Sequence, residues 1–347
     1  MKTRCWQFEE HGEPHEALQW REQELPEPGP GQALVALRAI GLNRSELRYV
    51  AGSYVPPRSL PSCVGHEGVG EILALGPPNP EAPASPHTPL EVGARVALMP
   101  GRVDMVSQGS YRQHGVYDQQ ALLPVPAALT DEEAAGFWMG VLTMGGAFLT
   151  AGFDPAQAAG KRVLITAAAS GMGVMGLRMA RAWGAETLAV TRSPHKQERL
   201  GRLADHVLVC TEPNRLASLV HTATRGEGFD VALDPVGAEY VPGLLQAAAP
   251  LASMVIYEMI SGREAQLALP MMLVKDLGLH GFTLFQLFRT PGMLDRVIDL
   301  GLSLGEDGVP VVSEVFPLED APGALSVMSH GQHLGKLVLT NSCSASL

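Results

Sequence analysis

The segment that most constrains the fold is "VLITAAASGMGVMGLR" (residues 163–178). β-Branched and apolar residues give way to Gly171, Gly173 and Gly176, and then to a helical pattern. A strand, a G-x-G-x-x-G turn and a helix in this order are typical of dinucleotide binding. The glycines allow a tight turn, a close approach of a pyrophosphate to the backbone, and contact between helix and strand. The alternative is a glycine-rich turn that only packs.

Strand-like and helical segments alternate on both sides of this turn. The strand-like pieces are "KRVLITA", "ETLAVT", "HVLVC", "FDVALDPV" and "ASMVIY". Such alternation predicts an α/β fold with a doubly wound parallel sheet and helices on both faces. We expect the helix after the glycine turn to run from 171 to about 183. Its first amides would bind the anion, which assigns cofactor contacts to Ser170, Gly171, Met172, Gly173, Val174 and Gly176.

The end of the second strand indicates which dinucleotide is bound. Proteins that bind NAD carry Asp or Glu about twenty residues after the glycine turn, where it accepts hydrogen bonds from the ribose. This chain has Thr191, Arg192, Ser193 and Lys196 there instead. A guanidinium and an ammonium attract a 2′-phosphate, whereas a carboxylate repels it. The prediction is NADPH, and the alternative is that Arg192 and Lys196 are solvated surface charges.

The chain of 347 residues is long enough for two domains. Its first 126 residues are rich in Pro and Gly and contain short alternating runs such as "ALVALRAI", which predict strands joined by turns. Strand-like pieces return near the end, in "VPVVSEVF" and "GKLVLT". We therefore expect a β-rich domain of residues 1–128 and 288–347, interrupted by a nucleotide-binding domain of residues 129–287. Residues 77–89 are proline-rich and predict a surface loop.

The net charge and the cysteine content indicate which partners and which cellular compartment to expect. A net charge of −11 argues against nucleic acid or an anionic membrane as a partner. Four scattered cysteines predict no disulfide framework and a reducing, cytoplasmic location. The beginning of the chain, "MKTRCWQFEEHGEPHE", is too charged for a secretory apolar region.

One uncharged run, residues 134–153, is long enough to cross a bilayer. However, Thr130 and Glu133 just before it have capping-box spacing, which is typical of the start of a helix in a water-soluble domain. We therefore predict a buried helix rather than a membrane span.

Several segments together match a known family: "GLNRSELRYVAGSY" (41–54), "LPSCVGHEGVGEI" (60–72), "GSYRQHGVY" (109–117), the glycine turn, "FDVALDPVG" (229–237) and "GKLVLT" (335–340). Over nearly its whole length the chain resembles the medium-chain dehydrogenase/reductase superfamily, and within it the zinc-independent quinone oxidoreductase and enoyl reductase branch. The resemblance implies a GroES-like catalytic domain, a Rossmann domain that binds NADPH, and an active site in the cleft between them. It also implies oligomers, and the apolar run 282–287, "FTLFQL", suggests a homodimer formed at a sheet edge.

Metal binding is the first question that this resemblance raises. Zinc enzymes of the superfamily carry a cysteine ligand where this chain has Asn43, and the neighbouring ligand positions hold Arg44 and Glu46. His66 and Glu67 remain, but a lone histidine with a glutamate is not a tetrahedral site. We predict no metal. The alternative is a zinc-type alcohol dehydrogenase that uses Cys63, His66 or Glu67.

Without a metal to polarise an alcohol, the chemistry left is hydride transfer to an electron-poor small molecule. An α,β-unsaturated carbonyl, an enoyl thioester and a quinone all qualify. The resemblance places Tyr54 where relatives carry a proton donor, although it could instead line the pocket. A different class of function also stays open, that of a non-catalytic NADPH-binding protein.

The resemblance assigns the remaining site residues. By this resemblance Asn43, a candidate catalytic residue, would hold the nicotinamide ribose or an active-site water, although it could instead only form the turn after the glycine. Thr143 would lie beside the nicotinamide. Lys336 could reach the cofactor or be a surface cation. Tyr111 and Trp138 could shape the substrate pocket or belong to the core. His66 could be a hydrogen-bonded structural residue or an acid/base group.

Overall fold

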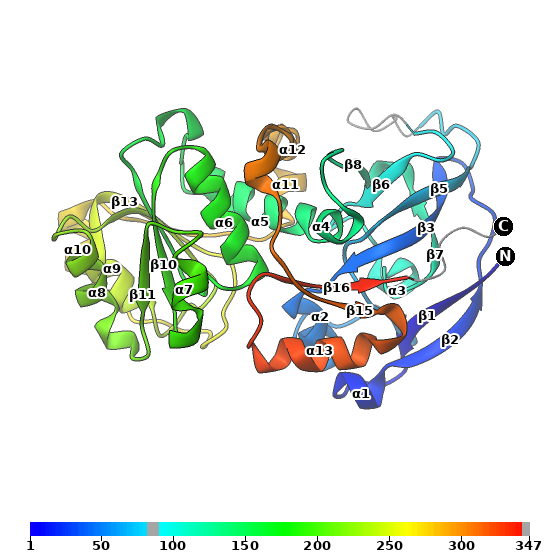
Figure 1. Ribbon diagram of the computed structural model, residues 1–347, viewed down its shortest axis with the longest axis horizontal. Coiled ribbons are helices and arrows are strands. Elements are labelled where there is room, and N and C mark those ends of the chain that lie inside the picture. Colours follow the sequence, from blue (N-terminus) through cyan, green and yellow to red (C-terminus); the bar gives the residue numbers. More distant parts are fainter. Residues whose placement is uncertain (82–89, 342–347) are drawn as a thin grey trace. The chain divides into compact units, whose positions relative to one another are not determined.

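The computed structural model describes residues 1–81 and 90–341, so most of the predicted proline-rich loop lies outside the described residues. The chain forms two compact units. Unit 1 contains Met1–Met139 and Val309–Leu347, and unit 2 contains Gly140–Gly308. Each unit has its own sheet and core (Figure 1).

Unit 2 is built on a six-stranded sheet in the order β11-β10-β9-β12-β13-β14. All neighbouring strands in it are parallel, which confirms the doubly wound prediction. Its strands are β9 (Arg162–Ile165), β10 (Glu186–Thr191), β11 (His206–Val209), β12 (Phe229–Asp234), β13 (Ala248–Ile256) and β14 (Gly278–Gly281).

Helices cover both faces of this sheet (Figure 1). Leu164 of β9 joins the core cluster that contains buried residues of α8 and α9. The next residue, Ile165, points to the other face, where its side chain meets α6 at Gly176. The helices of unit 2 are α6 (Gly171–Ala182), α7 (Gln197–Leu200), α8 (Leu216–Ala223), α9 (Val241–Ala247), α10 (Leu269–Lys275), α11 (Gln286–Arg289) and α12 (Met293–Ser303), and α5 (Phe137–Thr150) spans the boundary between the units.

Unit 1 contains a seven-stranded sheet, β15-β16-β3-β5-β6-β8 with β7 paired to β3, and a smaller sheet, β2-β1-β4. Alternate residues of β3 are buried, as the pattern "ALVALRAI" predicts. The strands are β1 (Lys2–Phe8), β2 (Gln19–Glu24), β3 (Gln32–Gly41), β4 (Ser62–Cys63), β5 (Val69–Leu75), β6 (Arg95–Leu98), β7 (His114–Asp118), β8 (Leu122–Pro124), β15 (Val312–Pro317) and β16 (Lys336–Thr340).

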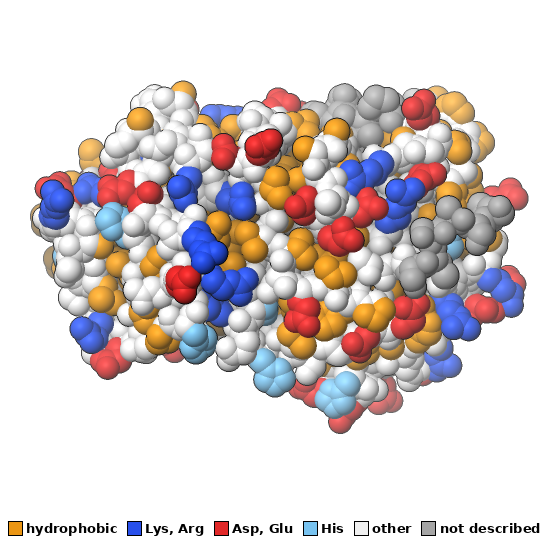
Figure 2. Space-filling view, in the orientation of Figure 1, with side chains coloured by type: hydrophobic (Ala, Val, Ile, Leu, Met, Phe, Trp, Pro, Cys, Tyr) orange, Lys and Arg blue, Asp and Glu red, His pale blue; other side chains and the backbone are white. Residues whose placement is uncertain are grey.

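A single core cluster joins these two sheets of unit 1. It combines side chains of β1, β3 and β5 with Leu325 and Met328 of α13. The helices of unit 1 are α1 (Pro14–Ala17), α2 (Arg44–Val50), α3 (Met105–Gln108), α4 (Asp131–Ala135) and α13 (Ala321–His330). On the face drawn in Figure 2, acidic and basic side chains lie side by side.

The uncharged run 134–153 forms parts of two helices, α4 and α5, separated at Gly136. The predicted capping box is present, with Thr130 Oγ1 accepting from the Glu133 amide and Glu133 Oε2 accepting from the Thr130 amide. Most of the run is buried, as expected. Among the described residues, no helix has both the length and the apolar character that a membrane span needs.

Two expectations about boundaries and edges need correction. The units divide at 139/140 and 308/309 rather than at 128/129 and 287/288. The reason is packing: α4 contacts β3 and β16, while Val297 of α12 lies against Gly145 of α5. The expected edge at 282–287 is also misplaced, because β14 ends at Gly281 and Phe282 and Leu287 are buried.

Candidate active site

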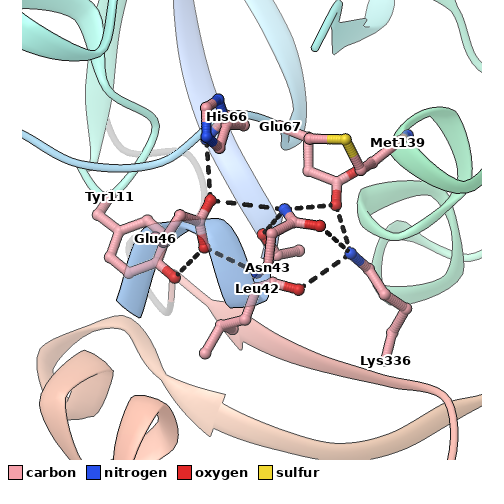
Figure 3. A network of polar contacts seen from close by, with 9 residues as sticks. Leu42, Asn43, Glu46, His66, Glu67, Tyr111, Met139 and Lys336 are labelled. Carbon is pink, nitrogen blue, oxygen red and sulfur yellow. Dashed lines mark hydrogen bonds and ion pairs between the residues drawn. The ribbon is translucent and has the colours of Figure 1, made fainter. Parts of the chain in front are cut away.

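Asn43 and Glu46 begin α2, directly after β3 ends at Gly41. Asn43 is the N-cap residue, and its amide donates to Glu46 Oε2 at 2.7 Å. Two further donors reach the same carboxyl group: the Tyr111 hydroxyl at 2.7 Å and the His66 amide at 3.0 Å (Figure 3). Three segments of unit 1 are thus joined at one buried carboxyl group.

Burial raises the pKa of Glu46 to about 7. The hydrogen bonds from Tyr111 and Asn43 and the charge of Lys336 oppose this shift but do not cancel it. Glu46 therefore changes protonation near neutral pH. The Tyr111 hydroxyl can donate to the ionised form and accept from the protonated form, so the pair tolerates both states.

Lys336 begins β16 and lies inside unit 1, with 4% of its surface exposed. Its ammonium donates to Glu67 Oε1 at 2.5 Å, Asn43 Oδ1 at 2.9 Å and the Leu42 carbonyl at 3.0 Å (Figure 3). All three of its donors are therefore used. The alternative that Lys336 is a surface cation is wrong.

Glu67 completes this network with both of its oxygens. Oε1 accepts from Lys336 and from Asn43 Nδ2 at 3.0 Å, and Oε2 accepts from the Met139 amide at 3.1 Å. That amide lies in the first turn of α5, where helix amides have no acceptor within their own helix. The buried carboxylate is thereby paired with a cation and fully hydrogen-bonded, which is the condition for an ionised group in a protein interior.

His66 directly precedes Glu67 in the sequence, and its side chain is half-buried. Burial, followed by the charge of Lys336, lowers the pKa of its imidazole to about 4. The ring is therefore neutral at pH 7, and its uncharged nitrogens can donate or accept one proton.

These contacts test whether the residues fit a zinc ion. Asn43 and Glu67 direct their oxygens at the Lys336 ammonium, and Cys63 Sγ accepts from Arg112 Nη2 at 2.9 Å. In the described part of the chain, no three His, Cys, Asp or Glu side chains are grouped as a metal site. The donor set therefore does not fit the tetrahedral coordination that zinc requires.

The aromatic residues predicted for the pocket have different surroundings in unit 1. Tyr111 is fully buried with its hydroxyl on Glu46, and Trp138 is 1% exposed with its indole nitrogen donating to the Pro124 carbonyl at 2.9 Å. Both are core side chains. Tyr54 is 43% exposed, with the Arg48 guanidinium 5.6 Å from its ring centre.

In unit 2, the glycine turn opens α6 as predicted. Ser170 is the N-cap residue, and its Oγ accepts from the Gly173 amide at 3.0 Å. A Cβ atom at Gly173 would lie 2.7 Å from the Ala167 carbonyl oxygen, and one at Gly176 would lie 2.7 Å from Ile165 Cδ1. Gly173 is therefore required by packing against the backbone, whatever the turn binds, whereas a side chain at Gly176 would have to displace the ends of two flexible side chains.

The carboxyl end of β10 carries the residues predicted for the 2′-phosphate. Arg192 is exposed, while Lys196 is buried, and burial lowers the pKa of Lys196 with Arg199 adding to the shift. Thr191 Oγ1 accepts from the Ser193 amide at 3.1 Å, which fixes the turn between them. A phosphate beside Lys196 would favour its charged form and oppose the effect of burial.

A further cluster lies at the carboxyl ends of β9, β12 and β13. The Thr166 hydroxyl donates to Asp234, whose carboxyl also accepts from the amides of Val236 and Gly237 at 3.0 and 2.9 Å. Burial raises the pKa of Asp234. Nearby, the buried Tyr257 hydroxyl has no hydrogen-bond partner among the described residues. Ligands of open α/β sheets bind outside the carboxyl ends of the strands, where the strand order reverses. A buried hydroxyl without a partner at this position is suited to bind a polar group of a ligand.

The predicted site residues thus fall into two groups. In unit 1, Asn43 contacts Lys336 directly, and Glu46 links Asn43 to Tyr111, whereas Tyr54 and Trp138 lie outside the network of Figure 3. In unit 2, the Ser170–Gly176 turn and the β10 turn both follow carboxyl ends of adjacent strands. Thr143 lies on α5 next to Met144, whose side chain meets Gly176.

Comparison with known proteins agrees with this division. A zinc-binding dehydrogenase family model matches residues 171–300, and an alcohol dehydrogenase GroES-like domain model matches residues 29–148. A quinone oxidoreductase of Pseudomonas aeruginosa is 29% identical over 96% of this chain and 98% of its own. The chain belongs to the medium-chain dehydrogenase/reductase superfamily. Within this superfamily, the matches support the zinc-independent quinone oxidoreductase and enoyl reductase branch.

Other relatives in the superfamily are oxidoreductases too. A 2-haloacrylate reductase of a Burkholderia species is 29% identical over 92% of this chain and 94% of its own. A solved mycobacterial quinone oxidoreductase is 26% identical with a TM-score of 0.81, covering 97% of this chain and 99% of that one. Unit 1 is therefore the GroES-like domain and unit 2 the Rossmann domain of a superfamily member, and the chain is an oxidoreductase.

Three residues of the candidate site were not identified from the sequence: Glu46, Tyr257 and Glu67. The Asn43–Glu46 pair has the same N-cap and N3 spacing that identified Thr130 and Glu133, so the role of Glu46 in the cap could have been found. Tyr257 directly follows the strand-like run "ASMVIY", at the edge where ligands bind. The pairing of Glu67 with Lys336 had no local signal, because these residues are far apart in the sequence.

Proposed function

We propose that the chain is an NADPH-dependent reductase that transfers hydride to an activated double bond or a quinone without a metal ion. The observation that carries this proposal is the contact of the Lys336 ammonium with Asn43 Oδ1 and Glu67 Oε1. A fixed cation already neutralises the oxygens that a metal would need. The acceptor must therefore be reactive without a bound Lewis acid, as conjugated carbonyls and quinones are. The names of the relatives, a quinone oxidoreductase and a 2-haloacrylate reductase, agree with that class.

NADPH would supply the hydride, and the protein would supply position and electrostatics. The amides from Ser170 to Gly176 would bind the pyrophosphate at the N-terminus of α6. Arg192 and Lys196, with the hydroxyls of Thr191 and Ser193, would bind the 2′-phosphate. The Tyr257 hydroxyl would gain the hydrogen bond that it lacks, and Thr143 would contact the nicotinamide.

In unit 1, Lys336 acts as a positioning residue, because its three donors are already engaged. It fixes the Asn43 amide group, whose oxygen keeps one lone pair for a ribose hydroxyl or a water molecule. Tyr54 is the proposed proton donor to the enolate. Its side chain is 43% exposed, which is compatible with delivery of a proton from bulk water.

Coenzyme choice can be tested without turnover. NADPH and NADH are titrated against protein fluorescence for the wild type and for the double variant Arg192→Gln/Lys196→Gln. NADPH affinity should fall about tenfold or more, which is about 1.4 kcal/mol, with little change for NADH. Arg202→Gln is the control, since this exposed arginine pairs with Glu198 instead. Equal binding of both coenzymes by the wild type would refute the NADPH assignment.

The acceptor is tested by following NADPH oxidation with 1,4-naphthoquinone, a simple enone and crotonyl thioester. Turnover of at least one is expected, and Tyr54→Phe should lower its rate about tenfold or more if Tyr54 donates the proton. An unchanged rate in this variant would make Tyr54 a lining residue. Tight NADPH binding without any turnover would instead indicate a non-catalytic protein.

We also propose a homodimer that forms at the open edge of the unit 2 sheet. β14 is the last strand of that sheet, and neighbouring α10 exposes Leu269, Leu273 and Val274 at 62%, 82% and 86%. An unpaired strand beside apolar side chains is a typical interface. Light scattering at micromolar concentration should give a dimer for the wild type and a monomer for Leu273→Glu/Val274→Glu. A monomeric wild type would remove this proposal.

A further inference from the structure

Two cysteines and an arginine meet on one face of the small sheet of unit 1. β1 pairs with β4 so that Gln7 is opposite Cys63, and Cys5, two residues earlier, lies on the same face as Gln7. Cys5 also forms an isolated bridge with Arg112. The Cys5 thiol donates to Gln23 Oε1 at 3.5 Å, and it lies close enough to Cys63 for each thiol to shift the pKa of the other. Both side chains are buried, at 0% and 1% exposure.

Arg112 explains the charge state of this cluster. Its side chain is 1% exposed, and in the described chain it donates to two carbonyls, Gly109 and Ser107, and to Cys63 Sγ at 2.9 Å. A buried guanidinium needs a counter-ion, and of these three acceptors only the sulfur can become an anion.

The pKa values agree with this geometry. A hydrogen bond from Cys5 lowers the pKa of Cys63 to about 6, with the charge of Arg112 acting in the same direction and burial opposing both. The hydrogen bond to Cys63 and burial raise the pKa of Cys5. One thiolate and one thiol in contact have the asymmetry of a nucleophile and its resolving partner.

We propose that Cys63 and Cys5 form a peroxide-reactive pair that closes to a disulfide. The Cys63 thiolate attacks one oxygen of hydrogen peroxide, the O–O bond breaks, and hydroxide leaves, which gives a sulfenic acid. The Cys5 sulfur then attacks Cys63, the S–O bond breaks, and the proton of Cys5 converts the departing hydroxide to water. One thiolate and one thiol together lose two electrons and one proton to form the disulfide, and one peroxide becomes one water and one hydroxide, which takes a proton from solvent.

This pair lies next to the candidate active site in the sequence. Arg112 follows Tyr111, whose hydroxyl donates to Glu46. A disulfide removes the thiolate and leaves the Arg112 guanidinium buried without its anion. The segment 107–112 must then rearrange, and the contact between Tyr111 and Glu46 is the part of the site that this movement reaches first. The proposal is independent of the coenzyme and of the acceptor.

The test is peptide mapping of the intact, folded chain after brief exposure to hydrogen peroxide. We expect a Cys5–Cys63 cross-linked peptide that disappears on reduction. In Cys5→Ser, a dimedone adduct should appear on Cys63, and in Cys63→Ser neither product should form. Cys210→Ser is the matched control, because that buried thiol has a raised pKa and faces the Glu212 carbonyl, and it should leave the cross-link unchanged.

Arg112→Gln should slow cross-linking about tenfold or more at pH 7, by raising the pKa of Cys63. Should this variant fail to fold, the pH dependence of the wild-type rate replaces it, and half of the maximal rate is expected near pH 6 rather than near pH 9. Absence of the cross-link in folded wild type, or oxidation of Cys210 as fast as that of Cys63, would overturn the proposal.

Discussion

In unit 1, the polar groups of the network formed by Asn43, Glu67 and Lys336 are satisfied by one another and by backbone groups. The polar groups at the carboxyl ends of the unit 2 strands are satisfied only in part. Glu67 has a cation and two amide donors, and Lys336 has three acceptors. At the carboxyl ends of the unit 2 strands, the Tyr257 hydroxyl has no partner among the residues that the structure describes, and Arg192 is exposed. The difference indicates two roles. The network of unit 1 stabilises the domain by itself, whereas the polar groups of unit 2 need a ligand to complete their hydrogen bonds.

The largest effect that tests this contrast is expected for Lys336→Met. It leaves the Glu67 carboxylate buried without a cation, which should lower the free energy of unfolding by about 3–5 kcal/mol. Urea denaturation followed by circular dichroism measures this. Lys2→Met is the control, because Lys2 and Glu22 form an exposed pair in the same unit, worth about 1 kcal/mol or less. An equally small loss of unfolding free energy for Lys336→Met would contradict the view that this network stabilises unit 1.

The pH dependence of stability tests the other carboxyl group of unit 1. The folded pKa of Glu46 is about 7 against an ordinary value of 4.5, so its contribution is complete below pH 4.5. As the pH rises to 7, the unfolded chain releases this proton first, and stability falls by an amount on the order of 3 kcal/mol. His66 acts in the opposite direction between pH 4 and 6.5, since its folded pKa is lowered.

The two effects are separated by the variant Glu46→Gln. The free energy of unfolding of the wild type minus that of the variant should fall with rising pH across 4.5 to 7, because the His66 contribution cancels in the difference. Parallel curves for the two proteins would show that Glu46 is ionised throughout.

Gly176→Ala tests the packing beneath the binding edge of unit 2. The new methyl group would lie 2.7 Å from Ile165 Cδ1 and 3.0 Å from Met144 Sδ, so these side chains must shift to make room for it, at a cost of about 1 kcal/mol. Gly281→Ala is the control, since nothing lies within 4 Å of a Cβ there. Thermal unfolding of both variants gives the comparison, and equal melting temperatures would count against close contact of α6 with β9.

The smallest effect on stability is expected for Tyr257→Phe in unit 2, and Tyr111→Phe in unit 1 gives the comparison. Tyr257→Phe removes an unpaired hydroxyl, so stability should be unchanged or rise slightly, while NADPH affinity should fall about fivefold, or about 1 kcal/mol. Tyr111→Phe removes a donor from buried Glu46 and should destabilise by about 1–3 kcal/mol. Calorimetry and fluorescence titration measure the two quantities. Similar losses of stability in both variants would erase the distinction between the units.

The sequence predicts what depends on local pattern. Alternating segments identified the parallel sheet, and the glycine turn identified α6 and its Ser170 cap, because strand and helix periods are written in neighbouring residues. Lys336 was harder to interpret, because its charge suggests exposure and its partners Glu67 and Asn43 are brought to it by sheet pairing alone. The same limit explains the misplaced edge strand: of the apolar run 282–287, Phe282 and Leu287 pack against Gly146 of α5 and are buried, while Phe285 is exposed.

The break between α4 and α5 at Gly136 limits which insertions and deletions the sequence can accept during evolution. A continuous helix through this position would bond the Met139 amide to a carbonyl one turn earlier, and Glu67 would lose an amide donor. Deleting one residue here would rotate every later side chain of α5 by about 100° and turn that amide away. Insertions and deletions should therefore be tolerated poorly at this short joint.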